Sequence, residues 1–393
     1  MKSSGTSIVV PCIMGDGVGP DIMRATRMVI DSAIEKTLGG ALKVEWKELP
    51  AGESSFKLNG EWLPSVTLET IKSHGVALKG PLTTPVGGGI RSLNVAIRQK
   101  LDLYASVRPV RYFKGVPSPV KQPEKMNIVI FRENTEDVYK GLEWKRDSQE
   151  ARDLRRFLKE RMGADLAEDT GIGIKPISER ASKRLVRAAI KYALKKKLNS
   201  VTLVHKGNIM KFTEGAFKEW GYELAREEFS DSVVFEQDMT SSTGPNSHVG
   251  KILINDRIAD NMFQQVLTRP AEYSVLATPN LNGDYLADAC AAQVGGLGLA
   301  PGANIGDDAA VFEAVHGTAP KYAGKNLANP CSMILSGVMM LEHIGMDSAA
   351  DMITGGIAKT LAEGVMTQDL ARLSSEKRFY RTSEFAVEVT RRF

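Results

Sequence analysis

Short apolar runs separated by longer segments with helical spacing constrain the fold of this chain more than any other feature. The runs with the composition of strands are residues 7–13, 76–78, 101–107, 127–131, 201–205 and 274–277. The segments with helical spacing include residues 21–37, 332–344 and 348–364. Strands that alternate with helices are typical of a mainly parallel α/β sheet, which we therefore predict. At 393 residues the chain is long enough for two lobes.

Charge and hydropathy exclude several classes of protein. The net charge of +4, from 51 basic and 47 acidic residues, is too nearly balanced to indicate nucleic-acid binding. Residues 180–197 form a basic stretch with helical spacing, which we interpret as the solvated face of a helix. No apolar run is long enough to cross a bilayer. We therefore expect a protein that binds neither membranes nor nucleic acid.

The cysteines and the N-terminus indicate the compartment. Cys12, Cys290 and Cys331 lie far apart, which favours neither a disulfide framework nor a zinc site. Residues 1–7 are short and polar and lack the features of a targeting signal. We expect a cytoplasmic protein.

A glycine-rich turn at residues 15–19 follows the first predicted strand. Its third glycine comes one position too early for the G-x-G-x-x-G dinucleotide fingerprint. The missing fingerprint argues against a Rossmann dinucleotide site. Glycines tolerate positive φ and close approach of other backbone segments, so we predict a tight turn from strand to helix.

Polar residues directly follow most of the predicted strands. These residues are Lys79, Arg108, Arg132, Lys206 and the segment 278–284. Ligands in α/β sheets gather at the carboxyl ends of the strands, so we predict the functional site there.

Residues 79–98 predict a loop that binds an anion. The first half of the segment is rich in glycine and hydroxyl groups, and Ser92, Asn94 and Arg98 then open a helix, whose N-terminal end favours negative charge. Arg98, Arg108 and Arg132 stand on three separate elements, and guanidinium groups bind carboxylates through paired hydrogen bonds. The pattern indicates a small substrate with several carboxylates.

Asp284 and Asp288 are four residues apart and should share one face of a helix. We predict that an Asn-Gly turn at residues 282–283 precedes the helix and that Gly295 and Gly296 end it. Carboxylates without nearby histidine or cysteine suit Mg²⁺ or Mn²⁺ better than zinc.

Five long motifs, in the same order and across nearly the whole chain, closely resemble those of prokaryotic-type NADP-dependent isocitrate dehydrogenases. The motifs are residues 79–98, 131–139, 205–211, 282–288 and 316–322. The resemblance implies the non-Rossmann α/β fold of the isocitrate/isopropylmalate dehydrogenase family, with a large and a small α/β domain. It places the large domain at residues 1–103 and 295–393, the small domain at 104–136 and 179–294, and a dimerising clasp at 137–178.

The resemblance also implies an activity and its residues. The activity is the metal-dependent oxidative decarboxylation of isocitrate to 2-oxoglutarate and CO₂ with reduction of NADP, a step of the tricarboxylic acid cycle. The implied substrate-binding residues are Ser92, Asn94, Arg98, Arg108 and Arg132. The implied metal ligands are Asp284 and Asp288 together with Asp260 from the other subunit of a homodimer with shared active sites. Tyr139 and Lys206 match the acid/base pair of the family, and Lys206 is also expected from the other subunit.

The implied cofactor site is an adenosine loop after residue 315. Its residues, with two further segments, are Thr83, His316, Gly317, Thr318, Ala319, Lys321, Tyr322, Asn329, Gln368 and Arg372. Lys321, Tyr322 and Arg372 match the positions that hold the 2′-phosphate in NADP-linked members. Gln368 stands where those members have a tyrosine, so one of the expected phosphate contacts is altered.

Several alternatives share these features. Relatives that act on isopropylmalate, homoisocitrate or tartrate would share the arginines, the aspartates, Tyr139 and Lys206 with isocitrate dehydrogenases. The polar Ser92 and Asn94 favour isocitrate. A non-catalytic regulatory subunit would be expected to lose catalytic positions that this chain retains. Ser92 also resembles a serine that regulatory kinases phosphorylate in some bacterial relatives, where a phosphate would repel an anionic substrate.

Overall fold

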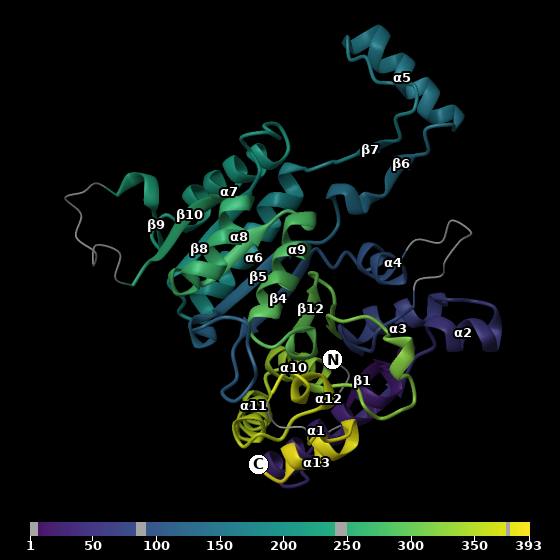
Figure 1. Cartoon of the computed structure of the whole chain (residues 1–393), viewed down its shortest axis with the longest axis vertical. Coiled ribbons are helices and arrows are strands. Elements are labelled where there is room, and N and C mark those ends of the chain that lie inside the picture. The colour runs from purple at the N-terminus through teal and green to yellow at the C-terminus, as the bar shows by residue number, and fades with distance from the viewer. Residues whose placement is uncertain (1–6, 84–91, 240–249, 375–377) are drawn as a thin grey trace.

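The computed structural model describes residues 7–83, 92–239, 250–374 and 378–393. Eleven strands of this described part form one central sheet in the order β2-β1-β3-β13-β12-β4-β5-β11-β8-β10-β9 (Figure 1). The strands are β1 (Ser7–Ile13), β2 (Lys43–Glu48), β3 (Val76–Lys79), β4 (Ala105–Arg111), β5 (Asn127–Glu133), β8 (Ser200–His205), β9 (Val233–Phe235), β10 (Ile252–Ile258), β11 (Val275–Thr278), β12 (Pro301–Ile305) and β13 (Ala310–Ala314). The α/β fold predicted from the alternating pattern is confirmed.

The sheet is parallel at both sides and antiparallel in the middle. Strands β2, β1, β3 and β13 run parallel to one another, and so do β5, β11, β8, β10 and β9. Between them, β12 pairs antiparallel with β13 and β4, and β4 pairs antiparallel with β5. Strand direction therefore reverses at the centre of the sheet, and the carboxyl ends of β3 and β5 point in opposite directions.

Helices from both ends of the chain pack together on the half of the sheet that contains β1. These are α1 (Gly19–Leu38), α10 (Cys331–His343), α11 (Asp347–Ala362) and α13 (Thr382–Thr390). The other half carries α6 (Glu179–Lys195), α7 (Glu214–Phe229), α8 (Ala259–Thr268) and α9 (Asn280–Gln293). Shorter helices are α2 (Gly52–Asn59), α3 (Ser65–His74), α4 (Leu93–Lys100) and α12 (Gln368–Ala371). One large cluster of buried apolar residues runs across both halves of the sheet, a second lies in the half with α8 and α9, and a third lies in the half with β1.

One segment leaves the body of the molecule. Strands β6 (Leu142–Trp144) and β7 (Ile172–Ile174) form a separate antiparallel pair, and α5 (Gln149–Met162) lies at their far end. Figure 1 shows this segment extending away from the sheet. We call residues 137–178 the arm.

Two local predictions were wrong. The strand predicted at residues 101–107 begins only at Ala105, because Leu101 closes α4 and Asp102 adopts a positive φ of 47°. Arg108 therefore lies within β4 and not after a strand. The turn predicted at residues 282–283 is absent, because α9 already begins at Asn280. Gly283 instead lets α9 approach β5: a Cβ there would lie 2.7 Å from Cβ of Arg132.

The turn predicted after the first strand agrees with the structure. Residues 15–19 form the tight turn between β1 and α1, where Gly15 and Gly17 have φ of 83° and 59°. Cys12, Cys290 and Cys331 are free and buried. Among the described residues, no helix combines the length and hydrophobicity that a membrane span requires.

The basic stretch at residues 180–197 coincides with α6, whose charges pair with acids of the same chain. Lys183 contacts Glu179 and Glu223 at 2.8 and 3.0 Å, and Arg187 contacts Glu228 at 2.5 Å. These pairs agree with its interpretation as a solvated helix face.

Candidate active site

A buried ion cluster lies where strand direction reverses. Lys79 at the end of β3 is paired with Glu313 of β13 at 2.5 Å, and Arg98 of α4 donates to the same carboxylate at 2.8 Å. Lys79 also donates to Oδ1 of Asn94 at 2.9 Å, which orients the amide of that residue. Burial opposes ionisation of Glu313, but the charges of Lys79 and Arg98 outweigh burial and hold its pKa far below the usual value. Two of the predicted substrate residues, Asn94 and Arg98, are thus fixed by a buried lysine and glutamate.

A second cluster gathers around Asp284 in the first turns of α9. Arg132 from the end of β5 forms an ion pair with one carboxylate oxygen, and Tyr139 donates to the other at 2.5 Å. Arg108 of β4 lies 3.4 Å from Asp284 and 3.7 Å from Asp288. Antiparallel pairing of β4 and β5 puts Arg108 and Arg132 on the same face, because residues two apart on a strand point the same way. The fold thereby brings five predicted site residues into one cluster.

The charges in this cluster alter one another's protonation. Burial disfavours ionisation of Asp284, but Arg132 and the hydrogen bond from Tyr139 outweigh it and lower the pKa of Asp284. Burial and the same hydrogen bond raise the pKa of Tyr139, and burial raises that of Asp288 against the opposing charge of Arg108. Burial and neighbouring arginines lower the pKa of Arg108 and that of Arg132, the latter to about 9. Near neutral pH the cluster holds an ionised Asp284 and a protonated Tyr139.

The two clusters leave buried donors that suit an anion. A cavity of about 90 Å³ is lined by Lys79, Asn94, Arg98 and Arg108. Among the described residues, Arg98 Nε and Arg108 Nη1 are buried without a hydrogen-bond partner. Unpaired buried N–H groups of arginine are costly, and carboxylate oxygens of a small ligand would satisfy them.

Lys206 and Asp260 form a pair of their own. Lys206, directly after β8, contacts Asp260 at the start of α8 at 2.5 Å. In the described part of the chain, no hydrogen bond or ion pair joins either residue to Tyr139, Asp284 or Asp288, and no group of three or more His, Cys, Asp or Glu residues could hold a metal ion. A single copy of the chain therefore brings together two of the three predicted metal ligands.

A separate cavity of about 530 Å³ holds most of the predicted cofactor residues. It is lined by Val18, Gly298, His316, Gly317, Ala319, Tyr322, Leu327, Ala328, Asn329, Gln368, Asp369 and Arg372. Nε2 of His316 is buried there without a hydrogen-bond partner among the described residues. The cavity fits the adenosine end of a phosphorylated nucleotide, because it offers an unpaired ring nitrogen at His316, an aromatic ring at Tyr322 and a cation at Arg372.

Four predicted site residues belong neither to the lining of these two cavities nor to the ion pairs described above. The carbonyl of Thr318 accepts from the amide of Val18 at 2.9 Å, and the amide of Thr83 donates to Asp16 at 2.8 Å. Lys321 is exposed in a short 3₁₀ turn, Pro320–Tyr322. Ser92 directly precedes α4 without capping it. The middle of the predicted anion-binding loop, residues 84–91, lies outside the described residues.

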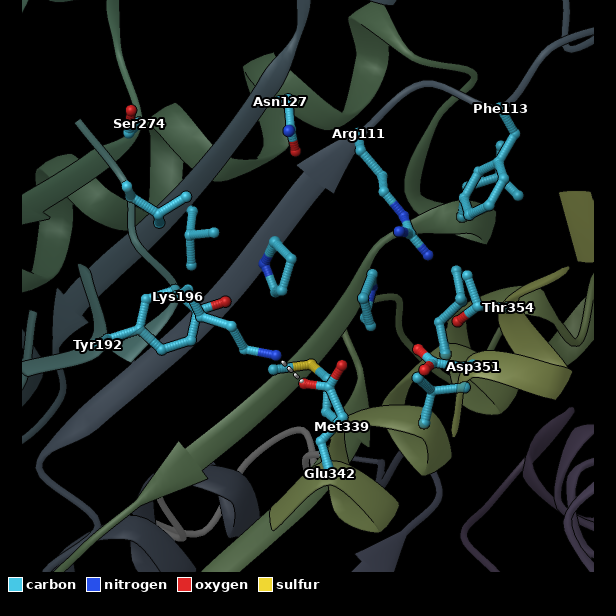
Figure 2. A pocket seen from close by; sticks show the side chains of 17 residues that line it. Arg111, Phe113, Asn127, Tyr192, Lys196, Ser274, Met339, Glu342, Asp351 and Thr354 are labelled. Carbon is cyan, nitrogen blue, oxygen red and sulfur yellow. Dashed lines mark hydrogen bonds and ion pairs between the residues drawn. The ribbon is translucent and has the colours of Figure 1, made fainter. Parts of the chain in front are cut away.

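A third cavity, of about 300 Å³, contains none of the predicted site residues. Figure 2 shows it between Arg111 of β4 and residues of α10 and α11, with Lys196 pointing toward Glu342. That ion pair measures 3.0 Å and both side chains are partly exposed. The predicted residues that line a cavity, among them Arg98, Arg108 and Arg372, therefore line the two others.

Sequence reasoning named Lys79 only as a polar residue after a predicted strand and missed Glu313 and Glu214, although all three organise the site. Glu313 and Lys79 are the buried pair that holds Arg98, and Glu214 accepts hydrogen bonds from the main chain of Lys206 and from the side chain of Asn282. Lys79 carried a signal, because a lysine directly follows an apolar run. Glu313 carried a weaker signal, because an acidic residue stands within an apolar run.

Known proteins resemble this chain over nearly its whole length. The family model described as isocitrate/isopropylmalate dehydrogenase matches residues 9–389. A relative from Staphylococcus epidermidis, named isocitrate dehydrogenase [NADP], is 56% identical and covers 97% of this chain and 94% of its own. A relative of the same name from Archaeoglobus fulgidus is 58% identical and covers 93% of this chain and 88% of its own.

A solved structure agrees with these relatives. The crystal structure of isocitrate dehydrogenase from Methylococcus capsulatus is 38% identical, with a TM-score of 0.80 over 98% of both chains. This likeness confirms the predicted fold class. The chain belongs to the isocitrate/isopropylmalate dehydrogenase family.

Proposed function

We propose that this protein catalyses the metal-dependent oxidative decarboxylation of isocitrate to 2-oxoglutarate and CO₂ with reduction of NADP. The observation that carries the proposal is the cluster of Arg98, Arg108 and Arg132 beside Asp284 and Tyr139. Relatives of 56% and 58% identity bear the name of this enzyme.

The substrate would be held by its carboxylates. Arg98 and Arg108 offer buried N–H groups without hydrogen-bond partners in the described chain, and Arg132 forms an ion pair with Asp284. Asn94, oriented by Lys79, adds a polar group where a substrate with an apolar branch would need an apolar one. This polarity favours isocitrate over isopropylmalate.

The donor set near Arg108 fits a divalent cation. Asp284 and Asp288 are hard oxygen donors one helical turn apart, and both lie within 4 Å of the same guanidinium. When bound, Mg²⁺ or Mn²⁺ supplies Lewis acidity that favours loss of the hydroxyl proton and stabilises enolate charge. Asp260 of a second copy of the chain would complete the ligand set.

Two side chains would handle protons. Tyr139 keeps its proton near neutral pH, because burial and its hydrogen bond to Asp284 raise its pKa. A phenol in that state can donate to the carbon from which CO₂ leaves. Lys206 of a second copy would take up the hydroxyl proton. Asp260 pairs with Lys206 in the same chain, so both groups would enter the neighbouring site together.

The cofactor would occupy the cavity beside His316. Arg372 and Tyr322 line that cavity and Lys321 adjoins Tyr322, which supports binding of a 2′-phosphate. NADP, when bound, accepts the hydride. Gln368 also lines the cavity and can donate a hydrogen bond to phosphate oxygens.

Assembly, location and regulation complete the proposal. We assign the arm to contacts between two subunits, and residues 1–103 with 295–393 to the large domain. Residues 104–136 with 179–294 form the small domain. Three buried free cysteines support a reducing cytoplasm. Ser92, at the start of α4, is the position where a kinase would switch the enzyme off.

The test is a spectrophotometric assay of nicotinamide reduction by purified protein. Isocitrate with Mg²⁺ should support turnover, with a higher kcat/KM for NADP than for NAD. Isopropylmalate serves as the control substrate. Comparable rates with isopropylmalate, or a preference for NAD, would contradict the proposal.

A further inference from the structure

A buried polar network beneath the site connects segments that lie far apart in sequence. Its centre is Lys175, at the end of the arm, which contacts Glu214 at 2.7 Å and Asp137 at 2.9 Å. Glu214 is 0% exposed and Asp137 is 1% exposed. One cation thus neutralises two carboxylates that are shielded from water, an arrangement that is stable only when every partner is present.

Glu214 links this network to Lys206 and to α9. One of its oxygens accepts from Lys175, and the other accepts from the main-chain N–H of Lys206 and, at 2.8 Å, from the side chain of Asn282. Asn282 lies in the first turn of α9, just before Asp284. The buried carboxylate therefore holds two segments that carry proposed catalytic and metal-binding groups.

Asp137 links the network to the turn that carries Tyr139. It begins the 3₁₀ turn Asp137–Lys140 with a positive φ of 67°, which is uncommon for a residue with a side chain. Its main-chain N–H donates to the carbonyl of Pro176 at 2.9 Å, and its carboxylate accepts from the N–H of Leu281 at 3.0 Å. The strained turn is thus held by the returning end of the arm and by α9.

We propose that Lys175 is a positioning residue: by holding Asp137 and Glu214 together it fixes the Tyr139 turn, the start of α9 and the main chain of Lys206, and ties all three to the root of the arm. The consequence for catalysis rests on the proposed function, whereas the consequence for local structure does not. The site of a chain then has its correct shape only when the end of that chain's arm is correctly packed.

The test uses Lys175→Met, which keeps the length of the side chain but removes its charge. A matched control is Arg392→Met, because Arg392 also bridges two carboxylates, Glu363 and Glu388, at 2.6 and 2.7 Å and is equally exposed at 18%. Lys175→Arg is the conservative variant expected to restore the network.

The first measurement is hydrogen–deuterium exchange of peptides that contain the amides of Leu281 and Lys206, in protein without substrate. The Leu281 amide donates to Asp137 and the Lys206 amide donates to Glu214. Exchange of both amides should therefore accelerate at least about tenfold in Lys175→Met, which corresponds to loss of one hydrogen bond to a charged group. Lys175→Arg and Arg392→Met should match the wild-type protein. Unchanged exchange in Lys175→Met, or equal acceleration in Arg392→Met, overturns the proposal.

The second measurement separates kcat from KM in the isocitrate assay. Lys175→Met should lower kcat at least about tenfold while KM for isocitrate stays within about twofold, because Tyr139 and Lys206 act during the reaction. An active wild-type enzyme whose Lys175→Met variant keeps full kcat overturns the catalytic part. A wild-type protein that does not oxidise isocitrate refutes the proposed function, and the exchange result still decides the network. If Lys175→Met does not fold, Glu214→Gln replaces it and should accelerate exchange of the Lys206 amide.

Discussion

Replacing Glu313 by glutamine should reveal how much the ion cluster beneath the substrate cavity contributes to stability. The side chains of Glu313 and Lys79 are 8% and 2% exposed, and that of Arg98 is 13% exposed. The substitution keeps shape but leaves two buried cations without their common counter-charge. Breaking a buried pair in this way costs about 3 to 5 kcal/mol. We expect the free energy of unfolding to fall by that amount.

The assay is urea denaturation followed by circular dichroism, at several pH values. Lys79 and Arg98 outweigh burial and lower the pKa of Glu313 from its usual 4.5, so its contribution is present above that value and is lost as pH falls through the folded-state pKa. The glutamine variant should therefore lose stability less steeply in acid than the wild-type protein. Added isocitrate should recover part of the loss, because its carboxylates can replace the missing charge.

Glu228→Gln provides the matched control. Glu228 pairs with Arg187 on the surface, where the two side chains are 39% and 34% exposed. Exposed pairs contribute at most about 1 kcal/mol. A loss for Glu313→Gln no larger than that of Glu228→Gln would refute the reasoning about the buried cluster.

Three further predictions concern the cofactor, the packing of α9 and the metal. Arg372→Ala should lower kcat/KM for NADP by roughly 10- to 100-fold, which corresponds to loss of one hydrogen bond to a charged group. It should leave kcat/KM for NAD nearly unchanged. Equal losses for both cofactors would contradict a role at the 2′-phosphate. Gly283→Ala should lower the melting temperature, because its Cβ would meet Thr278 and lie 2.7 Å from Cβ of Arg132, whereas Gly355→Ala, with open space around it, should not. Chelation by EDTA should abolish isocitrate oxidation and excess Mg²⁺ should restore it; activity that persists in EDTA would exclude a required metal.

Motifs within one segment could be predicted from sequence, because their residues follow local rules. Asp284 and Asp288 share a helix face by spacing alone, and residues 15–19 form a turn because of their glycines. The motifs shared with a known family supplied the sites that local rules cannot provide. Arg108 lies in the cluster around Asp284 although the predicted bounds of its strand were wrong. An error of a few residues in those bounds does not change that β4 pairs with β5.

Contacts between distant segments could not be predicted, because they depend on strand order. Glu313 reaches Lys79 only because β13 lies beside β3, and no local pattern encodes that neighbourhood. Lys175 was equally hidden, since its carboxylate partners stand on the Tyr139 turn and at the start of α7. Buried charges of this kind look like surface residues in a sequence.

The reversal of strand direction at the centre of the sheet has a consequence for folding during synthesis. Strands β5, β11, β8, β10 and β9 come from one continuous stretch, residues 127–278, whereas β3 and β4 find their neighbours β13 and β12 only after residues 301–314 have left the ribosome. The half formed by residues 127–278 can therefore fold first, whereas β3 and β4 each keep one unpaired edge until the last quarter of the chain has been synthesised. A chain truncated before β12 would expose both edges and would aggregate rather than yield a smaller stable protein.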